Sequence, residues 1–474
     1  MPSAERQFVM AARGSFSQAT DGLTTPLAVG FARMQTSSGT AGTGLAFISY
    51  RPSGVLVTEP GFAAPIPIRS GRIYAEIGGG MRTGVSLANP NSQAAAVSFF
   101  FTDAAGTNFG TSSITIAPNT QMATFLNEAP FASLTVSPFQ TPVTEARTFT
   151  FNSSVPISAL AIRGRTNERG DFMMTPVADL AAASTPSAVS IPHIADGGGW
   201  TTELLLVNDS DAAETGTLQF VSSAGQSMSV SLDGQTGPPY SYSIPARSSL
   251  RFRTAGAGNS AATGWIEILP SGNTRTPSAA AVLAARRSNV VVSETSISAG
   301  PAASAFRAYA ELSGNYAAKQ AGSSQTGVAI SNRANSAVNV TLEATNLGGS
   351  IVASTVITIQ ARAQVYLPLG EIPGLALAAP FKGVLWISSP AGSSISVSGL
   401  RARYNERQTP DLLVTAYPAF DEAAAGTTGI IFPQVVDSNS YSTQFVLIGA
   451  RAGPSSGSLQ FVSQSGQPLS LKLQ

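Results

Sequence analysis

Residues 191–232, IPHIADGGGWTTELLLVNDSDAAETGTLQFVSSAGQSMSVSL, are repeated in related form at residues 432–473, FPQVVDSNSYSTQFVLIGARAGPSSGSLQFVSQSGQPLSLKL. The segments that follow the first copy have their counterparts at the other end of the chain: FVMAARGSF (8–16) matches YSIPARSSL (242–250), and SGRIYAEI (70–77) matches SAFRAYAEL (304–312). The chain therefore begins with the back of one kind of domain and ends with the front of the same kind.

Short runs of alternating apolar residues, separated by Gly, Asn, Ser and Pro, recur along the whole chain. Examples are TELLLVN (202–208), GTLQFVS (216–222) and NVTLEAT (339–345). Such runs at intervals of about 8–12 residues are typical of β-sandwiches. We predict an all-β protein made of tandem immunoglobulin-like β-sandwich modules.

Two related module types alternate, and we name them A and B. The B type is recognised twice, because residues 84–107 match 327–350 and IRGRTNER (162–169) matches LRARYNER (400–407). The predicted modules are the C-terminal part of a split A module at 1–78, a B module at 79–186, a complete A module at 187–313, a second B module at 314–425, and the N-terminal part of the split A module at 426–474.

The two parts of the split A module carry apolar residues that need a partner. We expect them to form a joint through Phe8, Met10, Phe16, Phe445, Leu447, Leu459, Phe461, Leu469, Leu471 and Leu473. Burying one such side chain is worth roughly 1.5–3 kcal/mol, so an open half would forgo on the order of 10–20 kcal/mol. We expect the joint to form between copies, head to tail, as a homopolymer. The alternatives are closure within one chain, giving a ring, and a segment cut from a longer repetitive chain.

Composition narrows the class of protein. Charged residues are 11% of the chain and the net charge is +1, whereas nucleic-acid binding requires a basic surface. No apolar run approaches the ~20 residues that span a bilayer. The absence of cysteine excludes disulfides. Low charge with many Ser, Thr and Gly residues on short strands favours an extracellular or cell-surface location, although the opening residues 1–14 show no signal peptide.

An arginine motif recurs in both B modules. Arginines two residues apart on a strand point to the same face, and guanidinium groups suit bidentate interface pairs. The motif is a candidate clamp between domains or subunits, and the alternative is a solvated strand face with weak ion pairs. Its residues are Arg163, Arg165, Glu168, Arg169, Arg401, Arg403, Glu406 and Arg407.

The sequence offers no recurring catalytic or metal-binding pattern. His193 is the only histidine and is replaced by Gln434 in the second copy, which favours a polar residue at a strand end. The Asp-x-Asp pair Asp209 and Asp211 is not repeated in the other modules, and the Arg-Gly-Asp string at 169–171 becomes Arg-Gln-Thr in the second B module. We therefore expect no enzyme activity, no cofactor and no metal.

Aromatic residues are candidates for stacking on sugars, but their positions on strands favour core packing. They are Trp200, Trp265, Tyr240 and Tyr242.

The strings ADGGGWTTELLLVN, IPARSSL and RTNERGDF (165–172) resemble those of tandem repeat proteins encoded in acidobacterial-type genomes. The resemblance covers nearly the whole chain and implies secreted or surface β-modules, without a known activity or catalytic residues. The second B module departs from it, reading NERQTPDLL, which indicates that Gly170 and Asp171 are not required by the fold. We expect a structural subunit of an extracellular filament or surface appendage. The alternative is a surface adhesin or a glycan-binding repeat protein.

Overall fold

The computed structural model describes residues 2–39, 42–131, 143–177, 186–424, 429–438 and 440–474. In these residues every strand pairing is antiparallel and no α-helix occurs. The predicted all-β class with tandem sandwich modules is confirmed, and immunoglobulin-like connectivity stays a prediction. No helix in this part of the chain is long and apolar enough to cross a membrane.

The modules share one strand plan, seen most simply in the A module. If its main strands are numbered one to eight along the chain, one layer has the order 1-6-3-4 and the other 5-2-7-8. These strands are β13 (Val189–Asp196), β14 (Trp200–Val207), β15 (Glu214–Ser222), β18 (Tyr240–Ile244), β19 (Ser249–Arg253), β20 (Ala262–Pro270), β21 (Ser278–Arg287) and β22 (Val290–Ser298). A small hairpin, β16 (Ser231–Leu232) and β17 (Gln235–Thr236), lies between the third and fourth strands.

The two B modules follow the same plan. The first contains β6 (Ile68–Gly78), β7 (Met81–Ala88), β8 (Ala95–Thr102), β9 (Asn108–Ile116), β10 (Gln121–Phe125), β11 (Val143–Thr166) and β12 (Phe172–Pro176). The long β11 supplies both the sixth and the seventh strand, because its first part pairs with β6 and β8 and its second with β7 and β12. The second contains β23 (Ala305–Ser313), β24 (Ser324–Asn332), β25 (Val338–Asn346), β26 (Ile351–Ile359), β27 (Gln364–Pro368), β28 (Phe381–Ser388), β29 (Ile395–Tyr404) and β30 (Leu412–Pro418), with the short β31 (Phe420–Asp421) beside β23.

Strands from both ends of the chain form one further sandwich with this plan. From the C-terminal end come β32 (Gly429–Asp437), β33 (Tyr441–Ile448) and β34 (Ser455–Ser463); from the N-terminal end come β1 (Glu5–Met10), β2 (Ser15–Ala19), β3 (Ala28–Gly39), β4 (Thr43–Tyr50) and β5 (Gly61–Ala63). The layers have the orders β32-β3-β34-β1 and β2-β33-β4-β5. We call this sandwich the closing module.

Two predicted module boundaries need correction. Residues 70–77 and 304–312 were assigned to the ends of A-type modules, but they lie on β6 and β23, which pair with β11 and β28 of the B modules. Each is the first strand of its module, as β13 is in the A module. The boundaries therefore precede Ile68 and Ala305 rather than following residues 78 and 313.

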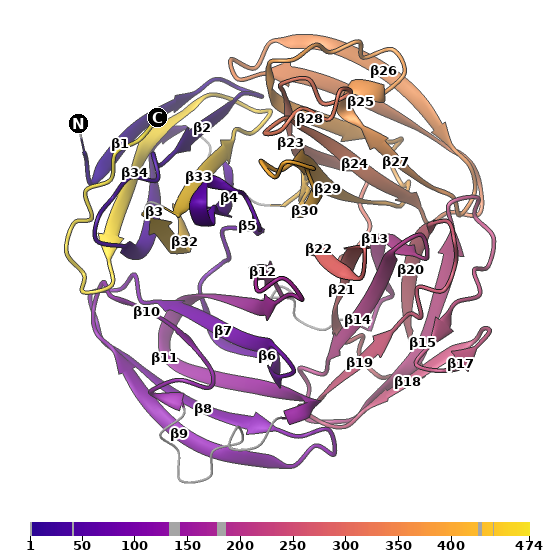
Figure 1. The fold of residues 1–474 in the computed structure, drawn as a ribbon, viewed down its shortest axis with the longest axis horizontal. Coiled ribbons are helices and arrows are strands. Elements are labelled where there is room, and N and C mark those ends of the chain that lie inside the picture. Colours follow the sequence, from indigo (N-terminus) through magenta and orange to yellow (C-terminus); the bar gives the residue numbers. More distant parts are fainter. Residues whose placement is uncertain (1, 40–41, 132–142, 178–185, 425–428, 439) are drawn as a thin grey trace.

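The four sandwiches form a ring in which the two chain ends lie in the same module (Figure 1). The fourth strands β1, β9, β18 and β26 lie toward the outer rim, and the eighth strands β5, β12, β22 and β30 lie toward the centre (Figure 1). Apolar side chains fill each sandwich, and the tryptophans Trp265 and Trp386 are fully buried. The ring thus presents edge strands outward. It also places the arginine-bearing strands of the B modules next to the neighbouring modules.

Candidate functional site

The joint between the chain ends is the first candidate site. In one layer β34 lies between β1 and β3, with Phe8 opposite Gly457. In the other layer β33 lies between β2 and β4, with Phe16 opposite Leu447. In each layer, a strand from the C-terminal end therefore lies between two strands from the N-terminal end.

The predicted joint residues meet in one hydrophobic core. Phe8, Met10, Phe445, Leu447, Leu459, Phe461 and Leu471 are buried in it, and Phe16, Leu469 and Leu473 are partly buried against it. Backbone hydrogen bonds extend the joint beyond the strands, with Ser3 and Leu471 exchanging bonds of 2.9 and 3.0 Å. The contacts that we expected between neighbouring copies are made here within one chain, because the ring of modules returns residue 474 to the side of Ala19.

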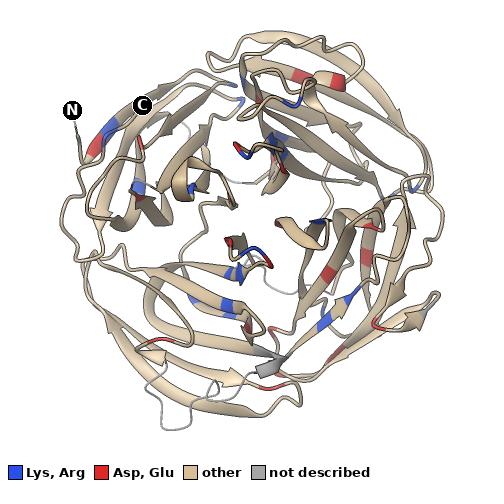
Figure 2. Cartoon of the chain, in the orientation of Figure 1, with Lys and Arg blue, Asp and Glu red and all other residues tan. Residues whose placement is uncertain are grey.

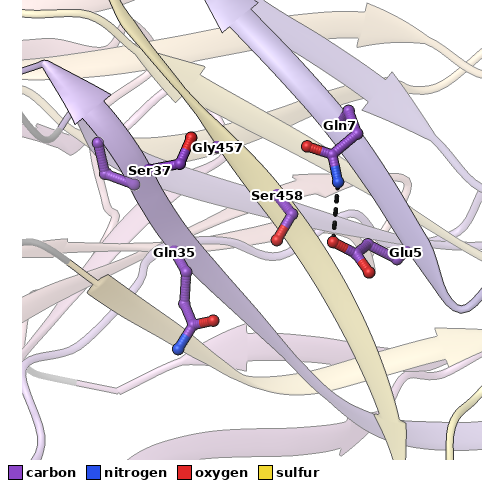
Figure 3. Close-up of a pocket in the computed structure, with 7 residues that line it drawn as sticks. Glu5, Gln7, Gln35, Ser37, Gly457 and Ser458 are labelled. Carbon is purple, nitrogen blue, oxygen red and sulfur yellow. Dashed lines mark hydrogen bonds between the residues drawn. The ribbon is translucent and has the colours of Figure 1, made fainter.

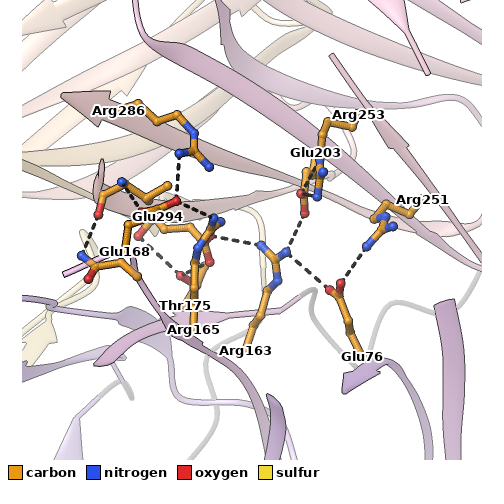
Figure 4. Close-up of polar contacts among 12 residues, drawn as sticks. Glu76, Arg163, Arg165, Glu168, Thr175, Glu203, Arg251, Arg253, Arg286 and Glu294 are labelled. Carbon is orange, nitrogen blue, oxygen red and sulfur yellow. Dashed lines mark hydrogen bonds and ion pairs between the residues drawn. The ribbon is translucent and has the colours of Figure 1, made fainter. Parts of the chain in front are cut away.

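The arginine motif of the first B module lies at its boundary with the A module (Figure 4). Arg163 on β11 is 2% exposed and places Nη2 2.7 Å from Glu203 Oε2 and Nη1 3.2 Å from Glu294 Oε2, both in the A module. Its Nη2 is also 3.4 Å from Glu76 Oε2 in its own module. One guanidinium therefore joins two modules through three carboxylates, and we call this group the first clamp.

Each carboxylate of the first clamp has a second arginine. Arg165 Nη1 lies 3.0 Å from Glu294 Oε2, Arg251 Nη1 lies 2.7 Å from Glu76 Oε1, and Arg253 contacts Glu203 Oε1. Burial alone would lower the pKa of Arg163, but the surrounding carboxylates, led by Glu294, outweigh burial and raise it. Arg163 therefore stays charged, and the negative charges of the surrounding carboxylates compensate for its burial.

The second B module makes the equivalent clamp with the closing module. Arg401 on β29 is 4% exposed, with Nη1 3.3 Å from Glu59 Oε2 and Nη2 3.0 Å from Glu311 Oε2. Its Nη1 also donates to Gln444 Oε1 at 3.1 Å, where the first clamp has a glutamate. Burial would raise the pKa of Glu59, but Arg401 lowers it below its usual value. We call this group the second clamp.

The rest of the motif reaches the neighbouring backbone. Glu168 Oε2 accepts from the amide of Val291 at 2.9 Å, and Glu406 Oε2 accepts from Leu56 at 2.8 Å. Glu168 also pairs with Arg286 at 2.9 Å. Glu406 has two arginine partners, Arg51 at 2.9 Å and Arg403 at 3.2 Å.

The loops that follow the two motifs meet near the centre of the ring, where Figure 2 shows charged residues of both signs. Arg169 Nη2 lies 2.8 Å from Asp411 Oδ2, and reciprocally Arg407 Nη2 lies 2.8 Å from Asp171 Oδ2. The B modules, which are not neighbours around the ring, are thereby connected. The Arg-Gly-Asp string is part of this contact, so its Arg and Asp are already paired.

The structure corrects the sequence-based interpretation of Asp171. Asp171 exchanges hydrogen bonds with Asn167, and Asp411 exchanges the same bonds with Asn405. Asp411 is thus the counterpart of Asp171, displaced by two residues through a longer loop. The acidic residue is common to both loops, and only the spacing differs.

His193 lies at the other kind of module boundary. Its Nδ1 is 3.1 Å from Gln364 Nε2 of the second B module, and the equivalent Gln434 accepts from Gln121 at 2.8 Å. Burial lowers the pKa of His193 to about 4, so the ring is neutral near pH 7. The histidine is a buried interface residue, and it lies inside β13 rather than at the strand end that the sequence suggested.

Several functional residues were missed by the sequence analysis, namely the carboxylates that meet the arginines: Glu59, Glu76, Glu203, Glu294 and Glu311. A signal existed, because Glu76 and Glu311 stand at the same place in YAEI and YAEL, and Glu294 and Glu59 at the same place in VSET and VTEP. These repeated glutamates can be recognised as ion-pair partners only once their position opposite the arginine strands is known.

No group of three or more His, Cys, Asp or Glu residues in the described ranges has the arrangement of a metal site. Of the aromatic residues considered for sugar stacking, Trp265, Tyr240 and Tyr242 are core residues and Trp200 packs against the core. A shallow groove of about 530 Å³ crosses the outer face of β1, β3 and β34, and Gln7, Gln35 and Ser458 line it (Figure 3).

Comparison with known proteins gives no functional class. No protein-family model matches the chain, and no curated protein matches it. Among solved structures, the chain is similar to "Thermotoga maritima 1070" (13% identity over 23% of this chain and 93% of the other, TM-score 0.19) and to the Anabaena sensory rhodopsin transducer (15% identity over 20% and 95%, TM-score 0.16). Likenesses this weak support no assignment of function.

Proposed function

We propose that this protein is a non-enzymatic structural subunit of an extracellular or cell-surface assembly, and that its closed ring is the building unit. The observation that carries the proposal is the closing module, in which strands from both chain ends share one core. Because strands from both chain ends complete the two layers of the closing module, its described residues form a whole core rather than two open halves. Such a unit can bind further copies of itself through its outer rim.

The charge distribution supports the same proposal. Several deeply buried charged side chains, including Arg163 and Arg401, are used in contacts between modules. Removing one partner of a buried ion pair costs about 3–5 kcal/mol, so these contacts fix the relative orientation of the modules. A rigid ring follows from this arrangement.

Head-to-tail joining would be the domain-swapped form of the same joint. If the N-terminal strands of one copy completed the closing module of the next, the contacts would be unchanged and an open polymer would result. Expected assembly therefore has two modes, rings that associate through their surfaces and rings that open into chains.

The proposal is tested on purified full-length protein by sedimentation velocity over a concentration series, together with negative-stain electron microscopy. We expect ring-containing assemblies that grow with concentration. Single rings at every concentration, up to the solubility limit, would contradict the proposal.

A disulfide distinguishes the two modes, since the chain has no cysteine. Val9 on β1 lies opposite Ser456 on β34, and directly opposed residues are close enough for a disulfide. Oxidised Val9→Cys/Ser456→Cys should run as a cross-linked monomer if rings close within a copy, and as a covalent ladder if copies join head to tail. The matched control is Thr215→Cys/Ser243→Cys, which occupies the equivalent pair in the A module and must cross-link within one chain.

A second candidate function, glycan binding, is favoured by the groove over β1, β3 and β34, whose amide and hydroxyl groups suit sugar hydroxyls. It predicts that Gln35→Ala/Ser458→Ala abolishes retention on immobilised polysaccharides. Absence of wild-type retention across a broad glycan array would remove this candidate.

A further inference from the structure

The outer edge strand β26 of the second B module differs from the other rim strands. It is the terminal strand of its sheet, and β25 is the one strand bonded to it in the described part of the chain. Its far edge therefore presents backbone N–H and C=O groups that can pair with another strand.

The exposed side chains of β26 include three apolar, β-branched residues beside the polar Ser354 and Thr358. Ile351 is 55%, Val352 46% and Val356 61% exposed. The strand IVASTVITI contains no charged residue and no proline, which are two usual means of blocking an edge, and its β-bulge at Val352 leaves the regular pairing of residues 353–359 intact. Exposed β-branched residues on an unblocked edge favour strand addition.

The equivalent strand of the first B module provides the contrast. Val356 pairs with Thr341 on β25, and Ser113 of β9 pairs with Ser98 at the same place on β8. By the same alignment Ile351 corresponds to Asn108. Thus two modules with one strand plan differ at these two rim positions, which are apolar in β26 and polar in β9.

The remaining rim edges are also polar at exposed positions. β1 exposes Glu5 and Arg6 beside Val9, and β18 exposes Ser241 and Ser243. β9 and β18 also lack charged residues, so what distinguishes β26 among the four fourth strands of the described chain is its group of exposed Ile and Val side chains.

We propose that β26 is a self-association edge, at which two copies of this chain pair their β26 strands antiparallel about a two-fold axis. With Val356 on the axis, the Val356 side chains of the two copies lie opposite each other and Ser354 of each copy lies opposite Thr358 of the other, within the regular part of the strand. Because the strand carries no charge, self-pairing places no like charges opposite each other, whereas two-fold pairing of β1 would bring its Glu and Arg residues into the contact. The position of β26 on the outer rim lets two rings meet edge to edge (Figure 1).

The size of this contact sets its strength. A single pair of nine-residue strands is a small interface compared with the ~1,200–2,000 Å² of stable complexes. The expected dimer is therefore concentration dependent, with a dissociation constant in the micromolar range or weaker. The inference rests on the proposed structural function and names a surface for it.

The test is sedimentation velocity of the full chain, wild type beside Val356→Lys, with Ser113→Lys on β9 as the matched control. Both substitutions replace exposed residues at equivalent positions, so both proteins should keep the wild-type circular dichroism spectrum and melting temperature. We expect Val356→Lys to weaken association at least tenfold and Ser113→Lys to leave it unchanged. A second variant, Ile351→Asn/Val356→Ser, gives β26 the residues of β9 at these two positions and should weaken association without adding charge.

The outcomes separate the two proposals. If wild-type protein assembles and Val356→Lys assembles equally well, the β26 contact is wrong and the structural function stands. If Ser113→Lys disrupts association as much as Val356→Lys, charge alone is responsible and the β26 contact is again wrong. If the wild type remains monomeric at every concentration, both proposals fail.

Discussion

The A module and the closing module have the same strand plan, but one is built from continuous chain and the other from two chain ends. The two modules differ in the number of charged residues on one pair of strands. These are β14 and β19 in the A module and the matching β33 and β2 in the closing module. Glu203 of the A module is replaced by Gln444 in the closing module. The arginines beside it are replaced as well, Arg251 by Ser17 and Arg253 by Ala19, according to the shared register.

The same trend holds in the other layer. Glu214, which is buried at the start of β15, corresponds to Ser455 at the start of β34. Bringing two free ends together requires every polar group at the seam to lose its water, and this costs several kcal/mol for an ion but much less for an amide or a hydroxyl. The closing module therefore carries fewer charges at these matched positions than the A module, although its seam keeps the buried Asp437, which accepts from Gly22 and Thr24, and the ion pair between Lys472 and Asp21.

The largest expected effect comes from placing a charge in each core. Phe461 and Phe220 occupy equivalent, buried positions. Replacing either by Asp loses the ~3–5 kcal/mol of the aromatic ring and adds an unpaired buried carboxylate. We expect Phe461→Asp to release residues 429–474, because the strands that pair with this segment belong to the opposite part of the sequence, whereas the strands around Phe220 are joined by short loops.

Limited proteolysis with mass spectrometry measures the difference. Phe461→Asp should lose a C-terminal fragment while the first B, A and second B modules resist cleavage. Identical fragment patterns from the two variants would show that the seam is no weaker than continuous chain.

The next effect compares the clamps. Arg401→Met leaves Glu59 and Glu311 with hydroxyl partners at close range, from Ser49 and Tyr309. Arg163→Met leaves each clamp carboxylate with another arginine, as described above. We expect a loss of about 3–5 kcal/mol in the free energy of unfolding for Arg401→Met and a smaller loss for Arg163→Met.

Urea titrations at several pH values check this expectation. In the wild type the pKa of Glu59 is lowered, so its contribution is present above the usual carboxyl pKa and is lost as pH falls. Without Arg401 the buried Glu59 should have a raised pKa, so acidification should reduce the deficit of Arg401→Met. A deficit that grows at low pH would contradict the assignment of Glu59 as its partner.

A third prediction concerns Glu214. Burial, with the nearby charge of Asp209, raises the pKa of Glu214 to about 8. A raised carboxyl pKa means that the folded state binds the proton more tightly, so stability falls as pH rises from about 4.5 to about 8. Glu214→Ser, which copies the closing module, should remove this slope and stabilise the protein by about 2–4 kcal/mol above pH 8.

Thermal unfolding between pH 4 and pH 9 measures the slope. Glu214→Gln is the control, because it keeps the size of the side chain and removes the titration. If both variants keep the wild-type pH dependence, another group is responsible for it.

Much of the fold could be predicted from the sequence because strand alternation and turn residues are local signals. The runs around Leu204 and Phe220, repeated at Phe445 and Phe461, indicated strands and equivalent modules. The first strand of each B module was misassigned because an apolar strand such as RIYAEI looks the same at the end of one sandwich as at the start of the next. Hydrogen-bond partners, which are long range, decide its membership.

The site was predictable in part for the same reason. The arginines were visible as a repeat, but the partners of Arg163 come from β6, β14 and β22, far apart in the chain. Closure within a copy and joining between copies use the same residues, such as Phe8 and Leu471, so no sequence pattern distinguishes them. Asp411 was hidden because its loop is longer than that of Asp171.

The smallest effect is expected from transferring charge into the seam. Gln444→Glu/Ala19→Arg gives the closing module the pair formed by Glu203 and Arg253 in the A module. Because Arg253 is half exposed, its pair is worth about 0–1 kcal/mol, and the new carboxylate also meets Arg401, which already donates to Gln444, so equilibrium stability should not fall. Closure should nevertheless slow, since both ends must desolvate an ion before they meet. Refolding kinetics of this variant beside Ala19→Ser measure the effect: a slower closing phase without loss of stability supports a kinetic cost of charge at these seam positions, and an unchanged rate would show that the missing charges have no bearing on closure.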